Sequence, residues 1–208
     1  MSAGKFIALE GGEGAGKSTQ ARLLAAALQQ RGIDAVLTRE PGGTPGAEAI
    51  RALLLANEGD GWHPRAEALL FAAARSDHVE RLIAPSLQQG RWVICDRFLD
   101  SSRAYQGGSG GLDDQELRQL HQIGSRGLLP DLTLLITVTP QIAAARLALR
   151  DEGRGDRIGS QPAEYHARVA SAFMHFAQQE PDRFLAVDGD DTAEVTHNNV
   201  MRAVERIL

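Results

Sequence analysis

The chain has 208 residues, enough for one α/β domain that covers residues 1–208 and buries a full core. Its formal net charge of −5 argues against a nucleic-acid-binding domain, because such domains usually carry a basic face, so we expect no nucleic-acid partner. The single cysteine, Cys95, excludes an internal disulfide, and no apolar stretch approaches the ~18 residues of a membrane span, which predicts a soluble, cytoplasmic protein with no membrane partner.

A glycine-rich segment near the N-terminus predicts a nucleotide-binding loop. Residues 6–9 are an apolar run typical of a buried strand, and apolar residues at helical spacing follow at 21–28. Between them stands Gly11-x-x-x-x-Gly16-Lys17-Ser18, the Walker A pattern. Glycines let backbone N–H groups approach phosphates, Lys17 adds a positive charge, and the Ser18 hydroxyl can ligate Mg²⁺. The predicted nucleotide-binding residues are Gly11, Gly12, Glu13, Gly14, Ala15, Gly16, Lys17, Ser18 and Thr19.

The following segments predict a strand, a loop and two helices. Residues 35–38 indicate a second strand, and the Pro-Gly-Gly run within 39–44 predicts a loop at its carboxyl end, where ligands bind in open α/β sheets. The two helices are expected over 47–55 and 65–89. Composition leaves open whether the loop is a ligand site or an ordinary turn. It also leaves open whether Phe71 and Arg75, four residues apart on one helix face, form a site or a solvated edge.

An apolar run that ends in aspartate predicts a third strand with a metal-supporting carboxylate. Residues 92–95 lead into Asp96-Arg97, which has the Walker B form in which the carboxylate supports bound Mg²⁺. Asp188 ends a similar run at 184–187, so this form is weak by itself. The adjacent Arg97 and the polar segment behind it favour Asp96 as the metal-supporting residue.

The segment 100–111 predicts a loop rich in side chains that can hydrogen-bond a base or sugar, with a flexible linker as the alternative. Asp113 and Glu116 then predict the capping box of a helix. A strand is expected over 132–138, and Pro140 predicts the first turn of the next helix.

An arginine-rich segment follows that helix. Arg150, Arg154 and Arg157 predict a charged lid over about 150–160, although a solvated surface turn has the same composition. The remaining elements are expected over 162–180, 184–187 and 192–207. Asp191 and Glu194 predict the cap of the last helix. Strands that alternate with helices in this way predict an α/β fold, a doubly wound parallel sheet of about five strands typical of P-loop NTPases.

Several enzyme classes share the phosphate loop. The Asn-Lys-x-Asp motif of regulatory GTPases is absent, since Lys5 and Lys17 are the only lysines. The Leu-Ser-Gly-Gly-Gln signature of transport ATPases is absent too. A small-molecule kinase needs a second pocket and a lid, and this chain has candidate residues for both.

Further motifs stand along nearly the whole chain. They are Glu13 inside the phosphate loop, Arg39-Glu40-Pro41-Gly42-Gly43-Thr44, Phe71 with Arg75, Asp96-Arg97-Phe98, and Ser101-Ser102 before Tyr105-Gln106-Gly107-Gly108. This combination resembles bacterial thymidylate kinase, a P-loop nucleoside monophosphate kinase, whereas the Gly-Phe/Tyr-Pro-Arg element of adenylate and cytidylate kinases is absent. The resemblance implies ATP- and Mg²⁺-dependent phosphorylation of dTMP to dTDP, in the biosynthesis of dTTP, by a homodimer.

The resemblance also implies which residues bind the acceptor. These are Glu13, Arg39, Pro41, Phe71, Arg75, Arg97, Ser102, Tyr105 and Gln106. Arg97 would hold the 5′-phosphate, and Glu13 the 3′-hydroxyl of the sugar. Phe71 would stack on thymine, while Arg75 would bond its O4. Tyr105 would crowd out a 2′-hydroxyl, and Ser102 and Gln106 would read the base edge.

The catalytic residues implied are Lys17, Asp96, Arg97 and Arg154. In the bacterial type the lid supplies the catalytic arginine, which matches Arg154, with Arg150 and Arg157 as competitors. One departure is that Ser109 stands after Gln-Gly-Gly, where the family often has an arginine.

A phosphate monoester is mostly a dianion at neutral pH, so we expect direct in-line transfer without a general base. The alternative is a related P-loop kinase of a deoxynucleoside or another small hydroxyl compound, which would need a base such as Glu10 or Glu13. A nucleotide-binding module without catalysis is the further alternative.

Overall fold

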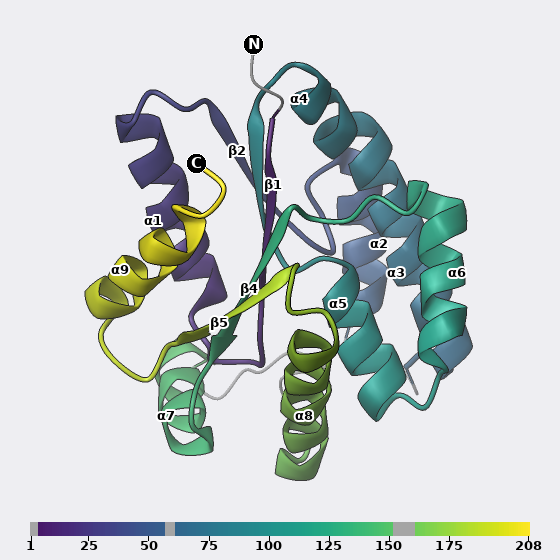
Figure 1. The fold of residues 1–208 in the computed structure, drawn as a ribbon. Coiled ribbons are helices and arrows are strands. Elements are labelled where there is room, and N and C mark those ends of the chain that lie inside the picture. The colour runs from purple at the N-terminus through teal and green to yellow at the C-terminus, as the bar shows by residue number, and fades with distance from the viewer. Residues whose placement is uncertain (1–3, 57–60, 152–160) are drawn as a thin grey trace.

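Five short apolar segments form one parallel sheet in the computed structural model, which describes residues 4–56, 61–151 and 161–208 (Figure 1). The strands are β1 (Phe6–Glu10), β2 (Ala35–Arg39), β3 (Trp92–Asp96), β4 (Leu132–Thr137) and β5 (Phe184–Asp188). Their order in the sheet is β2-β3-β1-β4-β5, with each neighbouring pair parallel. The α/β fold with a parallel sheet expected from the sequence is thus confirmed.

Helices cover both faces of the sheet. The helical segments are α1 (Lys17–Gln30), α2 (Pro45–Leu55), α3 (Pro64–His78), η1 (Val79–Ile83), α4 (Ala84–Gln88), α5 (Leu99–Ser102), η2 (Arg103–Ser109), α6 (Asp114–Ser125), α7 (Pro140–Asp151), α8 (Ala163–Gln179) and α9 (Ala193–Val204), where η marks π-helical geometry. Figure 1 shows α1 and α9 on one side of the sheet, with α2, α3, α4 and α6 on the other. Side chains alternate accordingly along β1: Ile7 and Leu9 belong to the cluster with α1 and α9, whereas Phe6 and Ala8 pack in the cluster with η1.

The two expected capping pairs have different outcomes. Asp113 and Glu116 form the expected capping box of α6. The expected cap of α9 by Asp191 is wrong, because the Thr192 side chain accepts the hydrogen bond from the backbone N–H of Val195 and is the N-cap.

The expected loop over 100–111 is also wrong for most of its length. Residues 99–109 are helical, as α5 and η2. The reason is tertiary: the backbone N–H of Ser101 donates to the buried Glu10 carboxylate, and Asp100 accepts hydrogen bonds from Arg103 and Arg183. Contacts from distant residues thus stabilise a helix that the segment's own composition does not favour.

Two further expectations concern single properties of the chain. Within the described ranges, no helix is long and apolar enough to cross a bilayer. Cys95 is fully buried in β3, and burial raises the pKa of its thiol well above the usual value, which fits an inert structural side chain.

Candidate active site

The loop between β1 and α1 has the backbone geometry of a phosphate cradle. Gly14 has a left-handed φ of 73°, and a Cβ there would lie 2.6 Å from the carbonyl oxygen of Ala143 in α7, so no side chain fits. Helix α1 begins at Lys17, directly behind the loop. Its first N–H groups and positive dipole end therefore lie where an anion would sit.

Lys17 lies inside this cradle. Its ammonium group donates to the carbonyl oxygen of Gly12 over 2.6 Å, and only 6% of the residue is exposed. Burial, together with the positive charge of Arg97, lowers the pKa of Lys17 to about 8. A bound phosphate would favour the charged form, so nucleotide binding and protonation of this amine are coupled.

Asp96, at the end of β3, meets the loop from the neighbouring strand. The Ser18 hydroxyl donates to its Oδ2, while Oδ1 is buried and has no hydrogen-bond partner within the described part of the chain. A hydroxyl and a carboxylate with an unsatisfied oxygen beside a phosphate cradle fit Mg²⁺, which binds through few protein oxygens plus substrate phosphates. Asp188, the competing aspartate, instead accepts from the backbone N–H of Asp190 and does not line the cavity described below.

The turn after β3 is held by Glu10. This carboxylate accepts from the backbone N–H of Phe98 (2.8 Å) and from both the N–H (3.0 Å) and the hydroxyl (2.7 Å) of Ser101. Burial, and then the charge of Asp100, raises the pKa of Glu10 to about 7. Arg97, inside the turn, has a left-handed φ of 69°, a conformation that these hydrogen bonds and its own N–H bond to Leu9 maintain.

The Arg97 guanidinium thereby lies beside the phosphate loop. It donates to the Glu13 carboxylate and, over 3.1 Å, to the Ser101 hydroxyl. Its central carbon is 5.1 Å from the centre of the Tyr105 ring, and the Tyr105 hydroxyl donates to Glu13 over 3.3 Å. A cation, a carboxylate and an aromatic ring thus meet beside the phosphate loop.

A second part of the site is centred on Arg75, which lies on α3. Arg75 donates from Nε to Glu40 (2.7 Å) and from Nη2 to the Ser102 hydroxyl (2.9 Å) and the Phe98 carbonyl (3.2 Å). Only 4% of Arg75 is exposed, so it is not the solvated edge that composition left open. Gln106 donates to Glu67 over 2.8 Å, which fixes its amide at the same wall.

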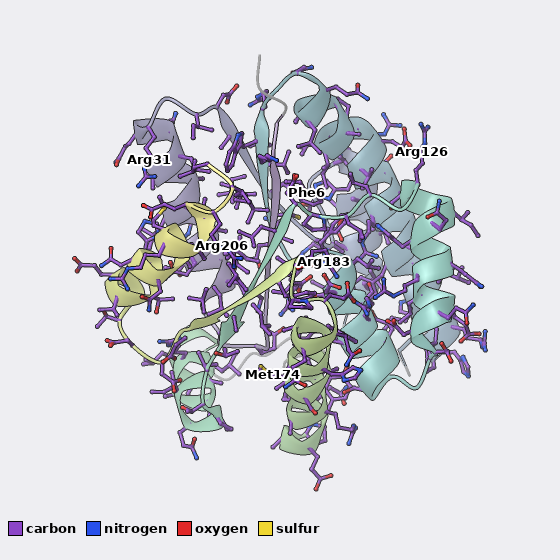
Figure 2. The ribbon with its side chains drawn as sticks, viewed as in Figure 1. Phe6, Arg31, Arg126, Met174, Arg183 and Arg206 are labelled. Carbon is purple, nitrogen blue, oxygen red and sulfur yellow. The ribbon has the colours of Figure 1, made fainter. Side chains whose placement is uncertain are left out.

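A buried ionic network supports α5 and η2 from behind. Asp100 has no exposed surface and accepts from Arg103 (2.7 Å) and from two nitrogens of Arg183 (2.6 and 3.0 Å). Figure 2 shows Arg183 toward the middle of the molecule, in the turn between α8 and β5, whereas Arg126 lies at the periphery. The network joins the end of α8 to the helical segment that carries Ser102, Tyr105 and Gln106.

One cavity of about 580 Å³ brings most of the candidate residues together. Those that line it are Glu13, Gly14, Gly16, Lys17, Ser18, Thr19, Arg39, Pro41, Phe71, Arg75, Asp96, Arg97, Ser102, Tyr105 and Gln106. Gly11, Gly12 and Ala15 do not line it. Arg39 is a partly exposed member that pairs with Glu48 over 3.1 Å. Arg154 and Arg157 lie outside the described residues, as does the side chain of Arg150.

Some cavity residues escaped the sequence interpretation. Arg51 on α2 donates to the carbonyl oxygen of Pro41 over 2.7 Å, and Arg146 on α7 donates to the carbonyl oxygens of Gly189 and Asp191. Arg51 falls between the buried positions Ala47 and Leu54. A cation on an apolar helical stripe is therefore the signal in the sequence that could have identified it as a site residue. The other lining residues without an assigned site role are Arg22, Leu55 and Leu147, together with Glu40, Phe98 and Ser101, which stand in the motifs named above.

Comparison with known proteins places this site in a family. The family model described as "Thymidylate kinase" matches residues 9–200. The chain is 53% identical over 205 residues to a thymidylate kinase of Rhizorhabdus wittichii, with 99% of each chain covered. It is 46% identical over 206 residues to one of Bradyrhizobium sp., covering 99% of this chain and 91% of that protein.

A solved structure agrees with these matches. The crystal structure of thymidylate kinase from Ehrlichia chaffeensis superimposes with a TM-score of 0.81 at 33% identity, covering 98% of this chain and all of that one. The match in fold, in length and in sequence identity leads to one conclusion. The chain belongs to the thymidylate kinase family.

Proposed function

We propose that this chain is a nucleoside monophosphate kinase that transfers the γ-phosphoryl group of ATP to dTMP and so forms dTDP and ADP. The observation that carries the proposal is the single cavity in which a Walker A loop faces Arg97, Phe71 and Arg75. One end suits the triphosphate donor, and the other offers a cation and a ring to a nucleoside monophosphate. The assignment of dTMP as the substrate rests on the thymidylate kinases that the chain resembles.

The acceptor roles follow from the contacts of each side chain. Arg97 binds the 5′-phosphate, because its guanidinium is held beside the phosphate loop. Glu13 binds the 3′-hydroxyl, and Tyr105, which contacts it, crowds the 2′ position. Phe71 stacks on thymine, while Arg75 bonds its O4. Further acceptor contacts come from Arg39, Pro41, Ser102 and Gln106.

Charge is the main barrier to the reaction. Two unit charges about 4 Å apart repel by roughly 4 kcal/mol at an effective dielectric of 20, and both reacting phosphates are anionic. Lys17 and Arg97 offset this repulsion from the two sides of the transferred group, and we assign the lid cation to Arg154. Ser18 and Asp96 would hold Mg²⁺, which would supply further positive charge to the reacting phosphates.

No general base is needed, because the second pKa of a phosphate monoester is about 6. The surroundings of Glu10 agree with transfer without a base, because this residue has no exposed surface and already accepts three hydrogen bonds. A hydroxyl substrate would require a free base in its place. The alternative of a hydroxyl kinase therefore loses one of its two candidate bases.

We further propose that residues 1–208 work as one kinase domain and form a homodimer. Three large apolar side chains, Leu53, Leu69 and Ile123, are 53%, 56% and 82% exposed on α2, α3 and α6, which pack side by side. Exposed apolar groups on adjacent helices suit burial against a second copy. Light scattering after chromatography should give twice the chain mass, and Ile123→Asp should shift it toward the monomer.

The function is tested by coupled measurement of ADP release with each nucleoside monophosphate as acceptor. We expect dTMP to give the highest kcat/KM and ribonucleotides to be poor acceptors. Binding of ATP without turnover in the presence of any monophosphate would overturn the proposal.

A further inference from the structure

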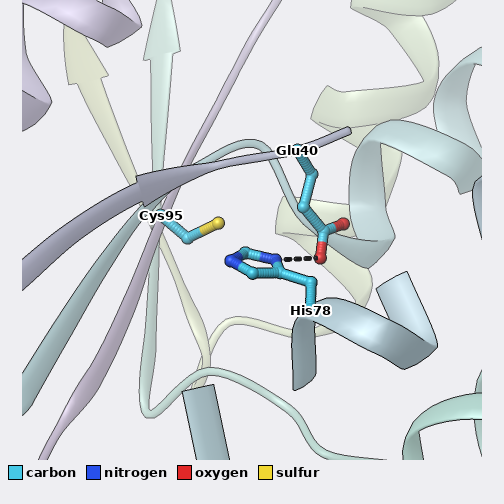
Figure 3. A group of neighbouring side chains, drawn as sticks. All are labelled: Glu40, His78 and Cys95. Carbon is cyan, nitrogen blue, oxygen red and sulfur yellow. Dashed lines mark hydrogen bonds and ion pairs between the residues drawn. The ribbon is translucent and has the colours of Figure 1, made fainter. Parts of the chain in front are cut away.

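A chain of hydrogen bonds runs behind the base-side wall of the cavity, from β2 to α3. The Thr38 hydroxyl lies 2.7 Å from Nε2 of His78, and Nδ1 of His78 lies 3.0 Å from Oε1 of Glu40. The other oxygen of Glu40 accepts from Nε of Arg75 over 2.7 Å. Figure 3 shows the His78 ring and the Glu40 carboxylate directed toward each other, with Cys95 on the far side of the ring.

These side chains include three potential metal ligands, since atoms of Glu40, His78 and Cys95 lie within 4.8 Å of one another. Their contacts favour a hydrogen-bonded network instead. Both ring nitrogens and both carboxylate oxygens have partners, and one of those partners is the cation Arg75. A metal ion would have to displace these bonds and approach a guanidinium in a buried site.

The network is enclosed by the surrounding fold. His78 has no exposed surface, and Glu40 and Arg75 are 6% and 4% exposed. The backbone at Gly43 lies so close that a Cβ there would come within 2.5 Å of both His78 Nε2 and Thr38 Oγ1. Burial by itself would raise the pKa of Glu40, but the charge of Arg75 and the hydrogen bond from His78 outweigh it and hold the pKa below its usual value.

An ionised Glu40 only accepts hydrogen bonds, so Nδ1 of His78 is the donor to it. This donor fixes one carboxylate oxygen, which leaves the other in line with Nε of Arg75. The contacts of Arg75 use Nε and Nη2, and no bond of Nη1 is found in the described part of the chain. Nη1 is therefore the nitrogen of Arg75 that is available to a ligand in the cavity that this residue lines.

We propose that His78 is a positioning residue for acceptor recognition, which fixes Arg75 through Glu40 and thereby sets the preference for a 4-oxo over a 4-amino pyrimidine monophosphate. The inference rests on the proposed function, in which Arg75 donates to O4 of thymine. A 4-amino group is itself a donor and cannot accept from a guanidinium held in this orientation. If this guanidinium were free to move, both the affinity for dTMP and the preference for the 4-oxo base would fall.

Two substitutions of His78, each by a residue with an amide side chain, form a matched pair for the test. His78→Asn keeps a nitrogen near the Nδ1 position and therefore a donor to Glu40, but it loses the contact with Thr38. His78→Gln places its amide near the Nε2 position, so it keeps the Thr38 contact and loses the donor to Glu40. Both changes are polar and remove the ring, so the pair separates the contact with Glu40 from the contact with Thr38.

We expect His78→Gln to weaken dTMP binding by about tenfold in calorimetry and to lower the ratio of kcat/KM for dTMP over dCMP, with ATP affinity within about twofold of wild type. His78→Asn should stay within about threefold for dTMP. A purely structural role would lower the melting temperature and the active fraction but leave both dissociation constants unchanged. Equal dTMP affinity of the two variants would overturn the proposal.

A double-mutant cycle with Arg75→Ala separates the possible failures. If His78 acts through Arg75, His78→Gln has little further effect on dTMP binding in the Arg75→Ala background, and an undiminished effect would refute the coupling. If Arg75→Ala alone binds dTMP like wild type, the base contact of the proposed function fails instead. Should neither His78 variant fold, Glu40→Gln replaces them with the same expected tenfold loss of dTMP affinity, and wild-type dTMP affinity of this variant would overturn the proposal.

Discussion

Asparagine in place of Asp100 tests the buried ionic network behind the acceptor wall. The wild-type carboxylate has no exposed surface and accepts from Arg103 at 2.7 Å and from Arg183 at 2.6 and 3.0 Å. Asparagine keeps the shape but removes the negative charge. It also turns an N–H₂ group toward one guanidinium, so that two donors face each other.

The loss of stability depends on the acidic partners that Arg103 and Arg183 keep in the variant. Removal of one partner of a buried ion pair costs about 3–5 kcal/mol. Arg103 keeps Asp114 (2.6 Å) and Glu180 (2.9 Å), and Arg183 keeps Glu180 (2.6 Å), so we expect the lower end of that range, about 3 kcal/mol. For a chain of this size each kcal/mol shifts the melting temperature by roughly 2–4 °C, which predicts a decrease of roughly 6–12 °C.

Thermal unfolding, followed by circular dichroism, measures this shift. The matched control is Glu80→Gln, the same change from acid to amide, whose partner Arg126 is 83% exposed and lies at the periphery in Figure 2. The control should cost less than about 1 kcal/mol. If Asp100→Asn lowers the melting temperature no more than Glu80→Gln does, the argument that burial makes this network essential is wrong.

Three further predictions concern catalysis. Arg97→Ala should weaken dTMP binding by roughly ten- to a hundredfold, since a charge-assisted hydrogen bond is worth about 1.5–3 kcal/mol, and calorimetry should find ATP binding intact; equal loss of both would contradict the assignment. Because the pKa of Lys17 is about 8, ATP binding at pH 8 should take up about half a proton and weaken as the pH rises to 9. Calorimetry in two buffers of different ionisation enthalpy measures this uptake, and its absence would refute the coupling. Arg154→Ala should lower kcat far more than it raises the KM for dTMP, by up to about 10³–10⁵, whereas a near-wild-type kcat would remove this residue from catalysis.

Local patterns were sufficient for the nucleotide loop and the order of elements. Gly16, Lys17 and Ser18 stand next to one another, so their spacing in the sequence already defines their geometry. The same holds for the strands, whose apolar runs show where each one lies, and for the capping box of α6. These features depend on neighbours in the chain and not on the rest of the fold.

Features that depend on distant partners were not predictable in this way. The segment over 99–109 has few apolar residues at helical spacing, and it is helical because Glu10 and Arg183, about 90 and 80 residues away, satisfy its polar groups. The contact between Glu40 and His78 joins residues 38 positions apart with no motif between them. Only the fold shows that Arg75 is part of a buried network and not a surface charge.

The pairing of β1 with β3 has a consequence for how the two halves of the site stay aligned. Leu9 lies opposite Asp96 in the ladder, so the phosphate loop after β1 and the turn after β3 leave the sheet from adjacent strands. Neighbouring strands lie about 4.7–4.9 Å apart, a spacing that backbone hydrogen bonds set and side-chain replacement does not change. Deletion of one residue within β3 would instead invert the face on which Asp96 stands and separate it from Ser18, so this enzyme should tolerate substitutions in these strands better than any change in their length.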